Sequence, residues 1–401
     1  MNILEGVKVV DLTIWAFCPA AGSILASWGA EVIHIENPSS PDPMRVFDGG
    51  TAEPGEANWM FKHYNRGKKG IALDLSSDEG REVFLRLIED ADVFLTSYLP
   101  ATRKKLGIDL DVIRERNPKI IIAKGTGQGP LGPQAERGGF DGASWWSRGS
   151  LAAAAMAVAG VEEPPGMIGH GDGMSGLVLA GGICAAMVKR ERTGEPSVVD
   201  GSLMGTAMWF NAPAIISSTF GGPGTFNSKP PRSARGWTTS TFRTSDDRFI
   251  YLSLLGDPQR DFVDLCQRLG CPQLIDDPRF TDAAARTANN ADLIAELDTV
   301  FAGFTYEGVF EALADLRAVW APVQTPREMH DDPQTVANNW VQNVSYSTGD
   351  IPLVVPPIMF DEDAGIITRA PDFAEHTTEV LTAINYDAEA IADMRARGVI
   401  A

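Results

Sequence analysis

Cysteine is scarce in this sequence. The 401 residues include only Cys18, Cys184, Cys266 and Cys271, and no two of them form a CxxC pair. This spacing excludes the common zinc and redox motifs and favours free, buried thiols in a reducing cytoplasm. The five histidines are scattered, with no acid or cysteine at convincing metal-ligand spacing, so we expect no metal site.

The sequence also lacks long apolar runs and has few cations. No uninterrupted stretch reaches the roughly 18 apolar residues of a membrane span, and no signal peptide is recognisable, so we expect a cytoplasmic protein with no membrane partner. Lys and Arg number 34 against 53 Asp and Glu, which gives a net charge of −19. A surface this acidic is not typical of a nucleic-acid-binding protein. A phosphate-bearing ligand therefore needs a local group of basic residues.

Hydrophobic residues make up 44% of the chain, enough for a sizeable core in two domains. In the first 125 residues short buried strands alternate with helices. This order predicts an α/β fold in which a Rossmann-like large domain holds a mostly parallel sheet. The expected strands are 7–12, 29–36, 71–74, 91–95 and 120–123, and the expected helices are 19–28 and 77–90.

The pattern changes after Gly221. Strand-like alternation over 236–254, with a turn at 245–248, is followed by helical segments, which indicates a smaller α+β domain. Beyond Pro333 the chain looks less regular until a final helix at 388–397. The predicted boundaries are 1–220 and 335–401 for the large domain, 225–330 for the small domain, and 221–224 and 331–334 for the linkers.

A dinucleotide-binding function fits this opening poorly. Glu36 ends the second strand near the place of a ribose-binding acid. However, the turn at 13–19 lacks the glycines that let a backbone touch a pyrophosphate. The one GxGxxG segment, 127–132, contains Pro130 and opens no obvious helix. We therefore reject an NAD-dependent enzyme.

The most informative segment is 169–176, in which Asp172 lies among four glycines just before a predicted helix at 176–192. A helix N-terminus favours an ionised acid, and glycine permits close approach of a ligand, which suits a carboxylate nucleophile. A glycine-rich turn capped by aspartate is the alternative. His170 is too close in sequence to Asp172 to form a convincing catalytic dyad with it.

Short motifs occur in a fixed order along nearly the whole chain, at 4–11, 29–36 with Arg45, 65–74, 117–118, 127–133, 190–194, 369–371 and 375–377. In this order they resemble the class III CoA-transferases, the family of formyl-CoA and carnitine CoA-transferases. The α-methylacyl-CoA racemases share that fold. The resemblance implies an intertwined homodimer that takes an acyl-CoA and a carboxylic acid as substrates. It implies coenzyme A as a substrate and no permanently bound cofactor.

The resemblance also implies roles for particular residues. Asp172 is the catalytic nucleophile, which forms an aspartyl anhydride and then an aspartyl-CoA thioester. Backbone N–H groups of the nearby glycines are the natural oxyanion donors. The implied CoA contacts are Trp15, Ala16, Phe17, Asn65, Arg66, Gly67, Lys68, Lys69, Tyr98 and Lys105, and the implied substrate pocket includes Phe140, Trp145, Gly171 and Gly173.

The loop at 65–69 suits this role chemically, because CoA carries a 3′-phosphate and a pyrophosphate that need cations and N–H donors. The same charges also fit an ordinary solvated loop. A CoA-binding protein without enzymatic activity would need this loop but not Asp172, so the intact 171–176 motif argues against it.

Two departures from the family pattern bear on the reaction. Phe140 stands where the racemases have a histidine base, which favours a transferase, although Asp257 near a racemase carboxylate keeps that alternative open. Trp145 and Trp146 replace a smaller polar pattern. They are either core residues or part of an acyl pocket, in which Arg148 is a candidate anchor for a distal carboxylate. The glycine-rich lid of the formyl-CoA enzymes is replaced by 254–258.

Overall fold

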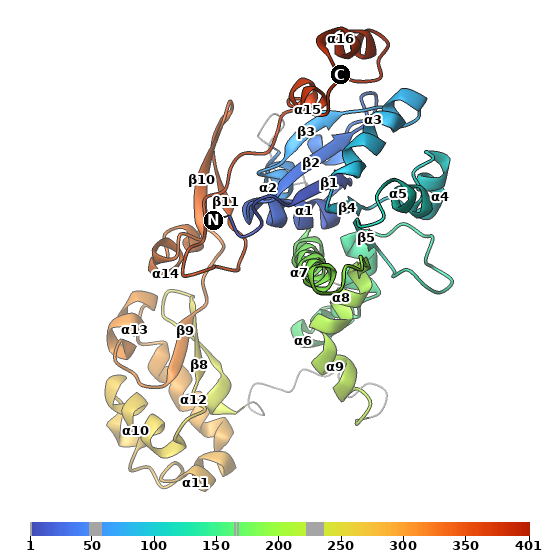
Figure 1. The fold of residues 1–401 in the computed structure, drawn as a ribbon. Helices are drawn as coiled ribbons and strands as arrows, with labels where there is room; N and C mark the ends of the chain where they lie inside the picture. Colours follow the sequence, from blue (N-terminus) through green and yellow to red (C-terminus); the bar gives the residue numbers. More distant parts are fainter. Residues whose placement is uncertain (1, 48–57, 164–165, 167, 222–235) are drawn as a thin grey trace. The chain divides into compact units, whose positions relative to one another are not determined.

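The computed structural model describes residues 2–47, 58–163, 166, 168–221 and 236–401 (Figure 1). The chain divides into two compact units, Met1–Asn227 with Pro333–Ala401, and Ser228–Asp332. Residues 222–224 of the predicted linker and 225–235 of the predicted small domain lie outside the described residues.

Unit 1 contains a six-stranded parallel sheet in the order β3-β2-β1-β4-β5-β6. This arrangement confirms the α/β fold predicted from the alternation of strands and helices. Apolar residues continue along the strands because a parallel sheet is covered on both faces. The strands are β1 Lys8–Leu12, β2 Glu31–Glu36, β3 Lys69–Ala72, β4 Val93–Thr96, β5 Ile121–Thr126 and β6 Val198–Ser202.

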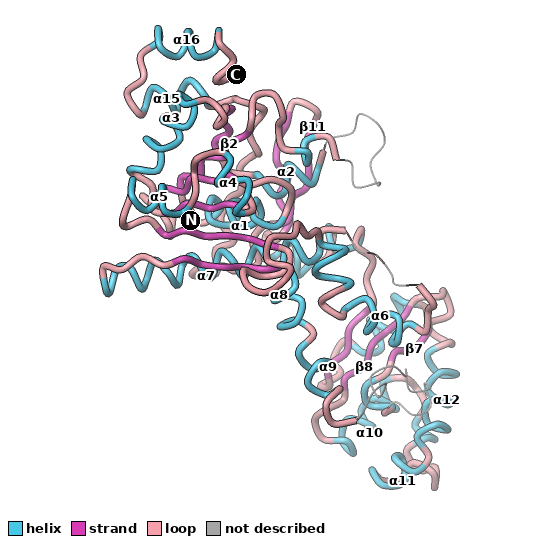
Figure 2. Tube along the Cα trace, turned by 90° about the vertical axis from the view of Figure 1, so that its right-hand side faces the viewer, coloured by secondary structure: helices cyan, strands magenta, loops and turns pink. Residues whose placement is uncertain are grey.

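Alternate residues of each strand serve different cores. Val9, Leu95 and Ile121 belong to the core formed with the helices α1 and α7, whereas their neighbours Val10 and Phe94 belong to the core on the opposite face. Figures 1 and 2 show α7 on one side of the strands and α3 and α15 on the other. The helices involved are α1 Phe17–Ser27 and α7 His170–Thr193 on one face, and α3 Asp78–Glu89, α5 Leu110–Arg116, α15 Thr377–Ala383 and α16 Ala388–Ala396 on the other.

Close packing of α1 on α7 requires a small residue at Gly176. A Cβ atom there would lie 2.5 Å from Cβ of Ala20 and 2.9 Å from the carbonyl oxygen of Phe17. Among the described residues, α7 is the one helix long and apolar enough to cross a membrane, but 44% of its most apolar stretch is buried within the fold. Its apolar composition is therefore accounted for in part by the core.

The remaining elements of unit 1 surround the sheet. The C-terminal segment is more regular than expected, since it forms a β-hairpin whose Val344 and Leu353 are buried. Polar residues interrupt the alternation in both hairpin strands, so their pattern gave little signal. These elements are α2 Trp59–Asn65, α4 Pro100–Lys105, α6 Leu151–Ala159, α8 Leu203–Phe210, α9 Ala212–Ser217, α14 Pro333–Ala337, β10 Val341–Tyr346 and β11 Gly349–Val354, with helical turns at Pro43–Arg45 and Asp141–Ser147. A further helical turn, Glu328–His330, belongs to unit 2.

Unit 2 has an antiparallel sheet in the order β7-β8-β9, and helices complete its core. The buried guanidinium of Arg286 donates to the carbonyl oxygens of Phe280 and Pro258, which ties two helix starts together. The elements are β7 Thr241–Arg243, β8 Phe249–Ser253, β9 Val319–Pro322, α10 Pro258–Arg268, α11 Ala283–Ala288, α12 Asn290–Phe301 and α13 Tyr306–Leu313, with short turns at Trp237–Thr239 and Pro272–Leu274.

Candidate active site

A cavity of about 1170 Å³ opens at the carboxyl ends of the strands in unit 1. Trp15 lines it from the loop after β1, Tyr98 from the loop after β4 and Gly127 from the loop after β5, while Asp172 faces it from the start of α7. The strand order reverses between β1 and β4. Ligands of open α/β sheets bind outside the carboxyl ends at such a point, so the topology alone marks this cavity as a binding site.

Asp172 lies inside the first turn of α7, because the helix begins at His170, six residues earlier than predicted. Gly169 precedes it with a φ of +76°, a conformation that favours glycine. The glycines suggested a turn because glycine disfavours a helix interior. In this fold tertiary packing outweighs that preference.

Gly171 makes room for other side chains. A Cβ atom at this position would lie 2.2 Å from Cγ of Trp145 and 2.3 Å from Oδ1 of Asp141. Its N–H donates to Oδ1 of Asp141 at 3.0 Å, and the N–H of Gly173 donates to the carbonyl oxygen of Gly169 at 3.1 Å. Neither Gly171 nor Gly173 lines the cavity, and both N–H groups already have acceptors. These contacts do not support the role of oxyanion donor that was expected for the two N–H groups.

Two carboxyl groups meet at the start of α7. Burial, together with the negative charge of Asp141, raises the pKa of Asp172 to about 7. Burial also raises the pKa of Asp141, whose Oδ2 atom is buried without a hydrogen-bond partner. Desolvation and like-charge repulsion thus outweigh the helix N-terminus, which by itself would favour the ionised form. Asp172 is poised to change protonation state near neutral pH.

Sequence reasoning did not assign these neighbours of Asp172. Asp141 follows Phe140 directly, and only the fold brings it to α7. The Tyr64 hydroxyl donates to the carbonyl oxygen of Gly169 at 3.0 Å and so fixes the helix start. Cys18 lines the cavity, and burial raises the pKa of its thiol, which keeps it protonated and unreactive.

The surroundings of His170 do not support a catalytic role. Its side chain is exposed, and Nδ1 lies 3.3 Å from the carbonyl oxygen of Ile168. Among the described residues, no group of three or more His, Cys, Asp or Glu side chains is placed to hold a metal ion. The carboxyl groups that line the cavity are those of Asp141 and Asp172.

The implied CoA contacts fall into two sets. Trp15, Phe17, Tyr98 and Lys105 line the cavity together with Asp172. Ala16 is buried beside them in the loop after β1 and does not line it.

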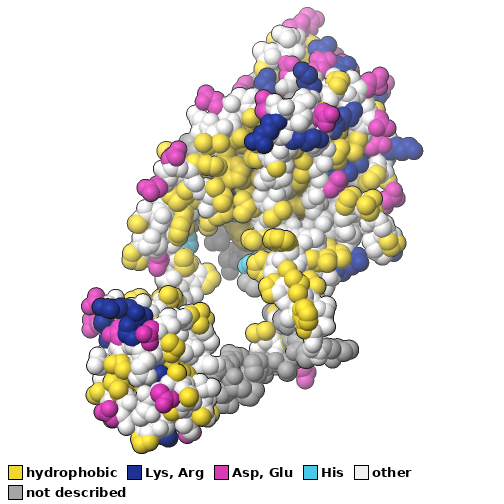
Figure 3. Space-filling view, turned by 60° about the horizontal axis from the view of Figure 1, so that its bottom comes forward, with side chains coloured by type: hydrophobic (Ala, Val, Ile, Leu, Met, Phe, Trp, Pro, Cys, Tyr) yellow, Lys and Arg dark blue, Asp and Glu magenta, His cyan; other side chains and the backbone are white. Residues whose placement is uncertain are grey.

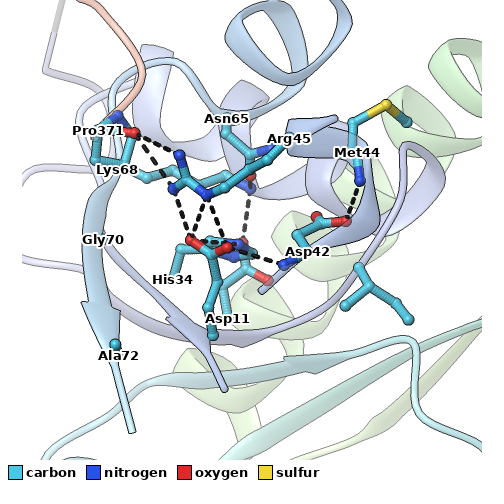
Figure 4. A network of polar contacts seen from close by, with 12 residues as sticks. Asp11, His34, Asp42, Met44, Arg45, Asn65, Lys68, Gly70, Ala72 and Pro371 are labelled. Carbon is cyan, nitrogen blue, oxygen red and sulfur yellow. Dashed lines mark hydrogen bonds and ion pairs between the residues drawn. The ribbon is translucent and has the colours of Figure 1, made fainter. Parts of the chain in front are cut away.

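The residues at 65–69 lie elsewhere. The Lys68 ammonium is buried 2.7 Å from Oδ2 of Asp11 and 2.8 Å from Oδ1 of Asn65 (Figure 4). The Arg66 guanidinium is also buried and contacts His63. Lys69 forms ion pairs with Glu31 and Glu379 at the surface, so the ammonium groups of Lys68 and Lys69 both have acidic partners within the chain. Asn65, Arg66, Gly67, Lys68 and Lys69 do not line the cavity.

The two tryptophans have different environments. Trp145 is in the core against Gly171, which corrects its expected place in the substrate pocket, whereas Trp146 lines the cavity. Phe140 lines it as expected and packs edge-on against Trp15, with ring centroids 5.4 Å apart. Arg148 does not line the cavity; its guanidinium donates to Gln128 at 2.7 Å.

Two acids considered from the sequence have structural partners. Glu36, at the place of a ribose-binding acid, is buried and forms a short ion pair with Arg45, 2.6 Å between Nη2 and Oε1. Asp257 caps α10 in unit 2 and accepts the N–H groups of Gln259 and Arg260, which lower the pKa of its carboxyl. The segment 254–258 thus leads into a helix instead of forming a glycine-rich loop.

These features define an α/β enzyme whose active site contains a carboxylate. They are the parallel sheet, the cavity at its switch point and the pair of carboxyl groups. A sequence model of CoA-transferase family III matches residues 4–377, and the chain belongs to this family and is a CoA-transferase.

Named relatives extend this result. The chain is 30% identical over 99% of both chains to the (R)-2-hydroxy-4-methylpentanoate CoA-transferase of Clostridioides difficile. It is 28% identical to the cinnamoyl-CoA:phenyllactate CoA-transferase of Clostridium sporogenes, over 98% of this chain and 96% of that one. Its structure is similar to a crystal structure of a CAIB/BAIF family protein from Brucella suis, with a TM-score of 0.80, 27% identity, and coverage of 96% of this chain and 100% of that one.

Replacing Lys68 by methionine should destabilise the fold. Burial by itself would raise the pKa of the Asp11 carboxyl, but Lys68 and His34 hold it at about 2. Without Lys68, the Asp11 carboxylate would lose its buried cation. We expect a loss of about 3–5 kcal/mol in the free energy of unfolding, measured with urea. The matched variant Lys69→Met removes half-exposed pairs with Glu31 and Glu379 and should cost less than about 1 kcal/mol. A stable Lys68→Met protein with weakened CoA binding would instead favour the phosphate-contact role.

The raised pKa of Asp172 predicts a pH-dependent reaction. If Asp172 is the nucleophile, only its ionised carboxylate attacks, so the rate should fall about tenfold per unit below pH 7 and reach a plateau above it. Asp141→Asn removes the neighbouring charge, retains an acceptor for Gly171, and should move the rising limb down by about one unit. The measurement is kcat/KM against pH, because this ratio reports ionisation of the free enzyme. Asp387→Asn, which alters only a cap of α16, should leave the profile unchanged; an unshifted Asp141→Asn profile would contradict the coupling.

Proposed function

We propose that this enzyme moves CoA from an acyl-CoA donor to a carboxylic acid acceptor through covalent intermediates on Asp172. The observation that carries the proposal is a partly buried carboxylate with a pKa near 7, facing a cavity of about 1170 Å³ at the switch point of the sheet. A cavity of this size suits a ligand as large as an acyl-CoA.

The chemistry begins when the Asp172 carboxylate attacks the thioester carbonyl of the donor. The carbon–sulfur bond breaks, leaving a mixed anhydride on Asp172 and a CoA thiolate. The thiolate attacks the aspartyl carbonyl, which releases the donor acid and gives an aspartyl-CoA thioester. The acceptor carboxylate then attacks this thioester and releases the CoA thiolate, which takes the acyl group from the new anhydride and regenerates Asp172.

Burial of Asp172 serves this chemistry in two ways. A poorly hydrated carboxylate is a stronger nucleophile, and the same lack of water protects the anhydride from hydrolysis. Burial also opposes ionisation, and a pKa near 7 leaves about half of the carboxyl groups ionised at neutral pH. Backbone N–H groups of the cavity-lining glycines are candidates for oxyanion stabilisation. These glycines are Gly125, Gly127, Gly138, Gly139, Gly142, Gly166 and Gly169.

The acyl group or the acceptor acid is at least partly apolar. Trp15, Phe47, Phe140 and Trp146 line the cavity, and a wall of aromatic side chains favours an apolar ligand over a small polar acid. The relatives from Clostridioides difficile and Clostridium sporogenes are named for a branched aliphatic acid and for two aromatic acids, which supports this choice.

The enzyme forms an intertwined homodimer, as the family resemblance implies. Hydrophobic side chains gather on the face of unit 1 shown in Figure 3, and such exposed patches mark association surfaces. Strongly exposed apolar residues include Trp209, Phe210, Ile216 and Phe220.

All four cysteines are free thiols, which suits a reducing cytoplasm.

Replacing Asp172 by alanine should abolish CoA transfer. Loss of a covalent nucleophile costs roughly 10³-fold or more in rate. CoA should still bind. Wild-type protein incubated with acyl-CoA and then hydroxylamine should carry a modification at Asp172, detected by peptide mass. His170→Ala, at an exposed neighbouring position, is the matched control and should retain the wild-type rate. A few per cent of activity in Asp172→Ala would exclude the covalent role.

The adjacent tryptophans provide a test of acyl selectivity. Trp146→Ala should change kcat/KM for aromatic or branched acids by about tenfold relative to acetate, because it alters the cavity wall. Trp145→Ala should lower stability by about 3–5 kcal/mol without changing this ratio, because that ring fills the core. Equal effects of both substitutions on selectivity would disprove the assignment.

The dimer is tested by light scattering over a range of concentrations. We expect twice the chain mass of 43.1 kDa, unchanged on dilution to micromolar concentration, because interlinked chains cannot separate without unfolding. A monomer under these conditions would refute the intertwined arrangement.

A further inference from the structure

The backbone of Trp15 has an unusual conformation. Its φ is +69°, in the left-handed region that bulky residues rarely occupy. Such a conformation persists only where the surroundings enforce it, and it occurs often at functional sites. Trp15 lines the cavity, and its ring packs edge-on against Phe47 and Phe140, at centroid distances of 5.9 and 5.4 Å. The strained residue therefore determines where three aromatic rings of the cavity wall lie.

Asp42 supplies a contact that holds this conformation. Its Oδ1 atom accepts the N–H of Trp15 at 3.1 Å and the N–H of Met44 at 2.9 Å. Only 2% of Asp42 is exposed, so water does not compete for these bonds. Met44 also lines the cavity. One carboxyl group thus joins two cavity-lining residues from separate loops, one after β1 and the other after β2.

Further contacts hold Asp42 in place through Glu36. Its N–H donates to Oε2 of Glu36 at 3.0 Å, and Glu36 is held by the Arg45 guanidinium at 2.6–3.1 Å (Figure 4). The guanidinium lies over the ring of Phe61, 3.9 Å from its centroid, and reaches the carbonyl oxygen of Pro371. The acceptor atom of Asp42 therefore has little freedom to move.

We propose that Asp42 is a positioning residue that clamps Trp15 and Met44 and so preforms the wall of the CoA cavity. This inference rests on the proposed function in taking the cavity as the acyl-CoA site. Asp42 does not line the cavity, so it acts through the backbone of its two neighbours. A preformed wall lowers the entropy cost of binding, and loss of the clamp weakens binding more than the chemical step on Asp172.

The acceptor atom matters here more than the charge. Burial raises the pKa of Asp42, and asparagine presents a carbonyl oxygen at the same place. Asp42→Asn should therefore rescue much of what Asp42→Ala loses. A role in charge balance alone would not give this rescue.

The first experiment measures binding of CoA alone by calorimetry, together with KM and kcat for acyl-CoA. In Asp42→Ala we expect the Kd for CoA and the KM to rise at least about tenfold while kcat stays within about threefold. Asp42→Asn should stay within about threefold of wild type for all of these values. Asp387→Asn, the α16 cap, is the control and should match wild type. An unchanged Kd in folded Asp42→Ala, or a kcat that falls as much as KM rises, overturns the proposal.

If Asp42→Ala does not fold, Asp42→Ser is used in its place. A double-mutant cycle then combines the change at Asp42 with Trp15→Gly. Glycine adopts a φ of +69° without restraint, so in a Trp15→Gly background the change at Asp42 should have at most about a third of its effect on Kd. Equal effects in both backgrounds overturn the proposal.

The proposed function has a separate test. It is refuted if Asp172→Ala transfers CoA, whereas the clamp is judged by CoA binding, which requires no turnover.

Discussion

The close contact of α7 with the turn at Asp141–Ser147 is the constraint on which the site depends. Because Gly171 has no side chain, Trp145 packs directly against the helix and Asp141 accepts an N–H from its first turn. That contact brings the charge of Asp141 toward Asp172 and shields both carboxyl groups in part from water. The raised pKa of Asp172 follows from this packing. Asp172 and the core are thus parts of one arrangement, in which the glycine motif has a structural cause.

A second set of contacts supports the loops after β1 and β2, which carry Trp15 and Met44. Asp11 pairs with Lys68 and Glu36 pairs with Arg45 beneath the loops after β1 and β2, and the buried ring of His34 lies beside Asp11. Buried charges are costly unless paired, so these residues accept only narrow geometries. They add specificity to a region where apolar packing alone would leave the loops free. The strained Trp15 backbone rests on this support.

Several features were predictable because they depend on local sequence. The parallel sheet followed from apolar strands alternating with helices, and the ordered motifs led to the family. The basic loop at 65–69 shows the limit of such reasoning. The family resemblance implied cations near a phosphate, but Lys68 is close to Asp11 in space and distant in sequence. Composition cannot show which charges the protein itself neutralises.

The sequence by itself determined the α/β class, the presence of Asp172 at a helix start and the family of the chain, because these depend on periodicity and ordered motifs. Only the tertiary structure decided that Asp141 raises the pKa of Asp172, that Trp146 and not Trp145 faces the cavity, and that Asp42 holds Trp15. Each of these depends on distances between segments far apart in the chain. Such distances result from packing of the whole core, which no local pattern encodes.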